Sequence, residues 1–292
     1  MLSIENELLK VSVKTVGAEI CSIIDKKNNQ EYMWEGDPAI WGSFAPVLFP
    51  IIGCLKDNEF LVNGKSYSVP KHGFIRNNTT LKSSILNNNT IEFRYKFDKT
   101  TLLNYPYSFE FVLHYILDGK TIHVQHTILN HDKQKPMYFS LGGHPGFKCP
   151  FFDGEKYEDY YIEFEQIENE STWQVTKEGL IDVTSIPCLE NTNRLQLNSS
   201  IFENDALIFK NLKSKKVVLK SDSHSNGIEI SFSDFNYLGI WAKPDAPFVC
   251  IEPWLGISDS ISTNKDFTQK EGIQLLEAGN QKKFTYSIRL LV

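Results

Sequence analysis

The sequence predicts an all-β fold, a large antiparallel β-sandwich or barrel. Short runs of β-forming residues recur along the chain, turn residues separate them, and helix signals are sparse. No Gly/Ser-rich or Pro-rich linker divides the 292 residues. No internal repeat of about 20–50 residues is present either. We therefore expect a single domain over residues 1–292, long enough to bury a sizeable core.

Two hairpins can be placed from their turns. Asn63-Gly64 joins 59–62 to 65–69, and Asp118-Gly119 with Lys120 joins 109–117 to 121–129. Both dipeptides tolerate the positive φ angles of a tight hairpin. The other elements are predicted from alternation and composition, with one short helix that Pro106 would end. These are strands over 91–97, 160–164, 216–219, 227–232, 237–241, 247–252 and 284–292, and a helix around 101–103.

Composition excludes several classes of protein. The net charge of −6 provides no broad basic field, so we expect neither nucleic acid nor an anionic membrane as a partner. No window reaches the roughly 20 apolar residues that cross a bilayer, and the acidic N-terminus lacks the apolar stretch of a signal peptide. Five scattered cysteines without a CxxC pair favour reduced thiols in the cytoplasm. Exposed strands could pair two copies into a homodimer.

The most informative segment is the apolar run from Phe248 to Trp254, which carries Glu252 at its expected end. Partial burial would raise the pKa of this carboxylate toward neutrality, as a general acid or base requires. The ring of Trp254 could stack on the apolar face of a sugar. The alternative is a strand-end glutamate that faces solvent.

Two glycine-containing segments carry further candidates. Gly73 follows His72 in a turn that would present the imidazole outward, with Arg76 on the same loop. The guanidinium fork suits pairs of sugar hydroxyls or a phosphate. His144 lies in Gly-Gly-His-Pro-Gly, where glycines let the main chain approach another group or a ligand closely. The alternatives are a solvated loop histidine at 72 and a turn histidine bonded to backbone at 144.

The remaining histidines and motifs point to no metal and no cofactor. His123 and His126 lie on opposite faces of one predicted strand and cannot ligate one metal together. His126 shares its face with apolar residues, so a hydrogen-bonded core histidine is expected. HExxH, GxSxG, GxxxxGK[ST] and GxGxxG are all absent, which removes the signatures of several enzyme classes.

Three motifs together resemble a known family. His72-Gly73-Phe74-Ile75-Arg76, His144-Pro145-Gly146-Phe147 and Cys250-Ile251-Glu252-Pro253-Trp254 occur in the order found in the aldose 1-epimerase, or galactose mutarotase-like, superfamily. The similarity is greatest to its bacterial LacX-like branch and runs along the whole chain. It implies a β-supersandwich with an open sugar cleft that interconverts α and β anomers of a free or phosphorylated aldose without a cofactor.

The resemblance also implies roles for particular residues. His144 looks like the general acid and Glu252 like the general base, while His72 and Arg76 resemble residues that hold the sugar. Asp205 resembles the substrate-binding aspartate of the family. Relatives of this branch often carry arginine where this chain has Cys54, which leaves Lys56 as the cation expected there.

The reaction that this resemblance implies suits the two candidate groups. Ring opening needs a base for the anomeric hydroxyl and an acid for the ring oxygen, and each can contribute roughly 10²–10⁴-fold. A second hypothesis is a non-catalytic sugar-binding or sugar-sensing protein on the same scaffold. A third is glycoside hydrolysis, with Asp205 or Asp245 as a second carboxylate beside Glu252. Lys56, Lys71, Arg76 and Lys243 are all eligible to bind a substrate phosphate.

Overall fold

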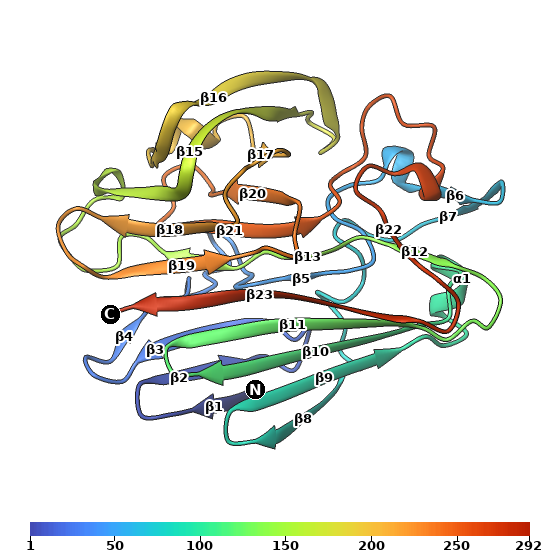
Figure 1. The fold of residues 1–292 in the computed structure, drawn as a ribbon, viewed down its shortest axis with the longest axis horizontal. Coiled ribbons are helices and arrows are strands. Elements are labelled where there is room, and N and C mark those ends of the chain that lie inside the picture. Colours follow the sequence, from blue (N-terminus) through green and yellow to red (C-terminus); the bar gives the residue numbers. More distant parts are fainter.

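A nine-stranded antiparallel sheet forms one face of the computed structural model, which describes all 292 residues (Figure 1). The expected hairpin over 109–129 and the C-terminal strand lie in its middle. Its strands, in spatial order, are β16 (Ile181–Gln196), β15 (Tyr160–Val175), β18 (Lys216–Ser221), β19 (Gly227–Ser231), β23 (Gln281–Leu291), β11 (Thr121–Asn130), β10 (Phe109–Asp118), β9 (Thr90–Lys96) and β8 (Lys82–Asn87).

A six-stranded sheet packs against part of this face and carries the candidate residues at 144 and 252. Its strands are β17 (Leu207–Phe209), β20 (Tyr237–Trp241), β21 (Phe248–Leu255), β13 (Leu141–Gly143) and β5 (Val47–Leu48), with β14 (Gly146–Lys148) also paired to β21. Every pair of neighbouring strands in both sheets is antiparallel.

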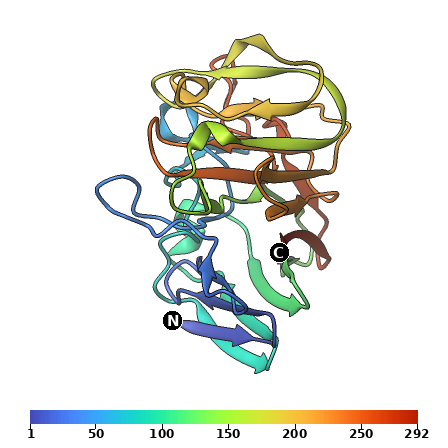
Figure 2. The ribbon, with the colours of Figure 1, turned by 90° about the vertical axis from the view of Figure 1, so that its left-hand side faces the viewer.

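Smaller elements complete the fold. A four-stranded sheet of N-terminal strands lies near β9, at the end of the molecule opposite the β15–β16 hairpin (Figure 2). None of the helices is long and apolar enough to cross a membrane. The elements are β1 (Leu2–Glu5), β2 (Leu9–Val13), β3 (Ile20–Asp25), β4 (Gln30–Glu31), β6 (Phe60–Val62), β7 (Lys65–Tyr67), β12 (Met137–Phe139), β22 (Gln274–Leu276), α1 (Thr101–Asn104) and 3₁₀ turns at Lys56–Asn58, Tyr157–Asp159, Ser199–Phe202 and Phe267–Gln269.

The all-β prediction is confirmed, and both hairpins lie where their turns predicted them. Gly119 adopts φ +56° between β10 and β11, and Asn63 and Gly64 adopt +51° and +75° between β6 and β7. The sequence did not predict β16, which follows β15 in a long hairpin. Most side chains of β16 are exposed and bulges shift its register, so it shows no alternating pattern.

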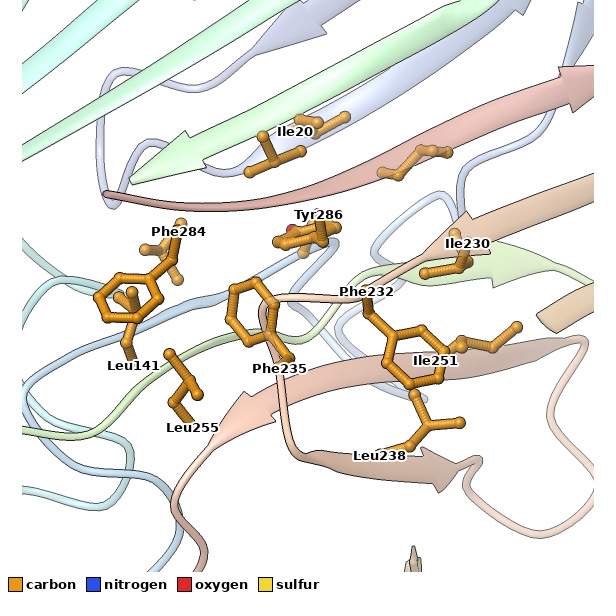
Figure 3. Packing of buried hydrophobic residues seen from close by; sticks show 14 of the residues in the cluster. Ile20, Leu141, Ile230, Phe232, Phe235, Leu238, Ile251, Leu255, Phe284 and Tyr286 are labelled. Carbon is orange, nitrogen blue, oxygen red and sulfur yellow. The ribbon is translucent and has the colours of Figure 1, made fainter. Parts of the chain in front are cut away.

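The core lies between the two large sheets (Figure 3). Ile230 and Tyr286 come from the nine-stranded sheet, while Leu141, Leu238 and Ile251 come from the six-stranded sheet. All belong to one cluster of 64 buried apolar residues. Burial of this extent is the main favourable contribution to folding.

Every residue of β21 is buried, and this strand separates the core from the candidate site. Val249, Ile251 and Leu255 belong to the central cluster, whereas Glu252 and Trp254 line a cavity on the other face. Side chains two apart share a face of a strand, which explains this division. Glu252 lies within the strand rather than at its expected end, because the ladder with β20 continues through Trp254.

His126 is a core residue, as expected, but its ring nitrogens have no aligned hydrogen-bond partner. Its imidazole is fully buried near Phe111, Phe235 and Tyr286. Burial lowers the pKa of His126 from 6.5 to about 3. The folded protein therefore holds this ring neutral at a pH at which the unfolded chain protonates it.

We expect His126→Leu to be more stable to unfolding than the parent protein, by a margin that grows as the pH falls. In the parent protein, His126 opposes folding between pH 6.5 and about 3, because the unfolded state binds the proton preferentially. In that window the free energy of unfolding of the parent protein falls by up to ~1.4 kcal/mol for each pH unit. Urea titrations at several pH values would measure it. His123→Leu, on the half-exposed face of the same strand, is the control, and equal pH dependence in the two variants would contradict this account.

Candidate active site

The structure brings Glu252 and His144 together. Glu252 comes from β21, and His144 comes from the turn between β13 and β14. Both β13 and β14 pair with β21, which brings the turn next to Glu252. Glu252 Oε2 lies 3.2 Å from His144 Nε2, with the carboxylate side chain 1% exposed and the imidazole 12% exposed. Oε2 nevertheless has no aligned hydrogen-bond partner. A buried, unpaired carboxylate oxygen beside an imidazole is costly and is typical of a functional site.

Both groups line an open cavity of about 670 Å³. The cavity also contains four more of the candidates from the sequence, His72, Arg76, Asp205 and Trp254. The loop after β7, the segment before β17 and strand β21 supply them, so residues far apart in the chain share one wall.

Lys56 does not line this cavity, which corrects the expectation that it replaces the missing arginine. Its backbone N–H donates to Asp259 Oδ2 at 3.0 Å, and its Nζ donates to the carbonyl of Ile261 at 2.7 Å. These bonds turn the side chain toward the 259–261 segment. The basic residues of the cavity are Lys71, Arg76 and Lys177, none of which forms a salt bridge.

Lys243 and Asp245 are also absent from the lining of this cavity. Lys243 Nζ donates to the carbonyl of Ile40, and Asp245 faces a separate cavity of about 220 Å³. Asp245 is therefore no partner for Glu252 in a two-carboxylate mechanism. Asp205 lines the main cavity in a left-handed conformation (φ +79°), and its Oδ1 accepts from the N–H of Ala206 at 2.7 Å.

The glycines around His144 allow close approach by aromatic rings. A Cβ at position 142 would lie 2.7 Å from the indole of Trp254, and one at position 146 would lie 2.8 Å from the ring of Trp41. A Cβ at 143 would meet the hydroxyl of Tyr286 at 2.4 Å. The glycine density of this segment therefore has the packing role that the sequence suggested.

His72 is buried rather than presented to solvent. It adopts φ +65°, and its Nδ1 accepts a hydrogen bond from the N–H of Gly53 at 3.1 Å. The neutral ring must then carry its proton on Nε2. Burial holds the pKa of His72 well below its ordinary value, and the nearby His144 and Lys71 lower it further. His72 is thus a fixed neutral donor in the cavity wall.

Burial shifts the two central groups in opposite directions. It raises the pKa of Glu252 well above the usual range, and the Asp205 carboxylate adds to this, while Lys71 opposes it. Burial lowers the pKa of His144 to about 3, with the Arg76 cation contributing. A proton shared by the pair therefore favours the carboxyl group.

Three tryptophans line the cavity, and the sequence singled out only one as a sugar platform. Trp254 is 5% exposed and packs among Leu48, Ile52 and Ile208, so little of its ring is open to a sugar, contrary to the expected stacking role. Trp41 and Trp241 are half-exposed. A lone Trp41 in a loop carried no local pattern that would have identified it.

The tip of the β15–β16 hairpin forms another wall. Val175, Lys177 and Gly179 line the cavity, and the carbonyl of Gly179 accepts from Ser258 Oγ at 2.6 Å. The same serine oxygen accepts from the N–H of Cys54. Cys54 thus lies beside the cavity wall, where a Cβ at position 179 would come within 2.8 Å of its sulfur.

His144, Cys250 and Glu252 form the one cluster whose ligand atoms, all within 4.8 Å, could hold a metal ion. The donor set does not favour that use. Burial raises the pKa of the Cys250 thiol well above its ordinary value, with the Glu252 carboxylate adding to the shift. A metal would require the thiolate. The arrangement is better suited to proton transfer between Glu252 and His144.

A β-supersandwich with this cavity defines a galactose mutarotase-like protein. Two solved structures share the fold: a galactose mutarotase related enzyme from Lactobacillus acidophilus (32% identity, TM-score 0.93, covering 99% of this chain and 96% of that one) and a galactose mutarotase-like protein from Lactobacillus casei ATCC 334 (30%, 0.92, 99% of each). The chain belongs to the aldose 1-epimerase family, whose model matches residues 1–275. The plasmid and chromosomal LacX proteins of Lactococcus lactis subsp. lactis are 35% identical over 298 residues, covering 99% of each chain.

Proposed function

We propose that this protein is an aldose 1-epimerase that interconverts the α and β anomers of an aldohexose or a hexose phosphate. The observation that carries the proposal is the 3.2 Å approach of Glu252 Oε2 to His144 Nε2 on an open polar cavity. An acid and a base this close can act on two oxygens bonded to the same anomeric carbon. The family membership supports a carbohydrate epimerase or carbohydrate-binding role.

In the proposed mechanism, ionised Glu252 removes the proton of the anomeric hydroxyl while the His144 imidazolium protonates the ring oxygen. The bond between the anomeric carbon and the ring oxygen breaks, which leaves an open-chain aldehyde. Rotation about the first carbon–carbon bond and reclosure on the other face return both protons. Neither group is consumed, so the cycle needs no further reactant.

The electrostatics of the cavity support this sequence of steps. After ring opening, Glu252 is protonated and His144 is neutral, which is the distribution that burial of the pair favours. The cavity thereby stabilises the protonation state of the open-chain intermediate. Lys71 and Arg76 lower the pKa of Glu252 and so help to make its ionised form available for the first step.

The substrate is best sought among neutral and phosphorylated hexoses. Glu252 Oε2, an acceptor, and Trp254 Nε1, a donor, lie buried in the cavity wall without aligned hydrogen-bond partners. Lys71, Arg76 and Lys177 could bind a phosphate, whereas Glu203 and Asp205 offset their charge on the same cavity.

We expect the protein to accelerate mutarotation of at least one freshly dissolved sugar among α-glucose, α-galactose and glucose 6-phosphate. Polarimetry or one-dimensional NMR of the anomeric protons would measure the rate against buffer. Sugar binding without acceleration of any of the three would support the non-catalytic sugar-binding alternative instead. Release of a nitrophenol from nitrophenyl glycosides would contradict the proposal in favour of hydrolysis.

A further inference from the structure

The indole of Trp41 lies stacked on the imidazole of His144. Their ring centroids are 5.1 Å apart with an interplanar angle of 28°. Trp41 belongs to the segment between β4 and β5, more than 100 positions before His144 in the chain. The proton-transfer steps described above assign it no role.

Several contacts build Trp41 into this position. The Trp34 indole N–H donates to the carbonyl of Trp41 at 2.8 Å, and Trp41 also stacks on Phe248 at 5.2 Å and 15°. The buried Glu19 carboxylate accepts from the N–H groups of Phe44 and Ala45 at 2.6 and 3.0 Å, which anchors the end of the same loop. The stack is thus part of the fold rather than a surface contact.

The face of an indole carries partial negative charge and attracts a cation. It therefore interacts more favourably with the imidazolium of His144 than with the neutral ring. The Trp241 indole lies against the same imidazole at 5.8 Å with an interplanar angle of 80°. The titratable or charged groups that also face or influence His144 are Glu252, Cys250, His72, Lys71 and Arg76.

These neighbours do not all favour a proton on His144. Lys71 and Arg76 repel it, as does burial, whereas Glu252 attracts it when ionised. An acid that is to protonate a ring oxygen needs a source of stabilisation for its charged form. Stacked Trp41 is the one aromatic face parallel to His144 that provides it.

We propose that Trp41 is a positioning residue, whose indole holds the His144 imidazole against Glu252 and stabilises its protonated form. The stabilising effect on His144 is a property of the structure alone. Its consequence for turnover rests on the proposed epimerase function.

The direct test is an NMR titration of the His144 imidazole in the parent protein, Trp41→Leu and Trp41→Phe. We expect the pKa of His144 to fall by about 0.5–1.5 units in Trp41→Leu, since that is the usual strength of a cation–π contact. In Trp41→Phe the pKa of His144 should fall less than in Trp41→Leu, because a benzene ring keeps a weaker negative face. An unchanged pKa in Trp41→Leu, with circular dichroism showing the native fold, would overturn the proposal.

Trp241→Leu is the matched control, because it removes a second indole from the same cavity that is not parallel to His144. A fall in the His144 pKa as large as in Trp41→Leu would show that general loss of packing causes the effect. In kinetic assays, we expect Trp41→Leu to lower kcat about 3–30-fold with KM little changed. The acid limb of the pH–rate profile should move to lower pH, because the pKa of His144 falls. A raised KM with unchanged kcat would show that Trp41 binds sugar instead.

The two readouts separate this inference from the proposed function. The titration needs no turnover, so a shifted pKa in a protein that accelerates no mutarotation would uphold the stack and reject the epimerase. Mutarotation by the parent protein, with an unchanged His144 pKa in the variants, would support the epimerase and reject the role of Trp41.

Discussion

Glu252→Gln should reduce mutarotation by roughly 10²–10⁴-fold, the usual contribution of one proton-transfer group. The amide keeps the size of the side chain but cannot accept the proton of the anomeric hydroxyl. The side chain is 1% exposed and its Oε2 has no aligned hydrogen-bond partner, so an amide of the same size can replace the carboxylate without breaking an aligned hydrogen bond at that atom. Sugar affinity should stay near that of the parent protein, which saturation-transfer NMR or calorimetry would measure.

Glu203→Gln provides the control, since this exposed carboxylate lines the same cavity but is not in contact with His144. Its rate should stay within a few-fold of the parent rate. Turnover by Glu252→Gln at the parent rate would rule out our role for Glu252. Equal losses in both variants would show that cavity charge matters rather than the position of one base.

The same substitution makes a prediction about stability. The raised pKa of Glu252 means that the folded state keeps a proton that the unfolded chain loses above pH 4.5. The contribution of this group to stability is therefore complete at low pH and is lost as the pH rises. Glu252→Gln should become more stable relative to the parent protein as the pH increases from 4.5 to 7.

The second large effect is expected behind the cavity wall, at the Lys270–Asp259 pair. Lys270 Nζ lies 2.5 Å from Asp259 Oδ1, with both side chains 3% exposed. Asp259 also anchors the hairpin tip, because its carbonyl accepts from the N–H of Ile181. Asp259→Asn should lower the free energy of unfolding by about 3–5 kcal/mol, because it leaves a buried ammonium without its counter-charge.

Urea titration would measure this loss as a lower midpoint with an unchanged slope. Asp259→Asn combined with Lys270→Met should recover most of the stability, since an apolar replacement removes the unpaired charge. Asp222→Asn is the exposed counterpart, because Asp222 is 68% exposed in its pair with Arg194. This substitution should cost far less stability than Asp259→Asn, since solvent screens an exposed pair. Equal losses in the buried and exposed pairs would contradict the burial argument.

The fold could be predicted where local chemistry decides the structure. Asn63-Gly64 and Asp118-Gly119 determine their turns through φ, and strands such as β9 (Thr90–Lys96) show which face is buried. Strand β16 could not be found this way, because its exposed side chains respond to no core and its bulges break the period. Its place depends on pairing with β15.

The candidate residues could be predicted only in part, for the same reason. Motifs in the chain singled out His72, Arg76, His144 and Glu252, and the structure gathers all four around one cavity. Lys56 was expected there from its position in sequence, but hydrogen bonds to Asp259 and Ile261 hold it elsewhere. Such distant bonds leave no trace in the local sequence.

By itself, the sequence determined that this is an all-β protein with an acid and a base on glycine-rich and apolar segments. Turn chemistry and strand alternation are local properties, so they can be predicted from the sequence. Only the tertiary structure decided that Trp41 lies on His144, that Lys71 and not Lys56 faces the cavity, and that Glu252 is desolvated. Those outcomes depend on contacts between residues far apart in the chain, whose distances and burial exist only once the sheets have packed.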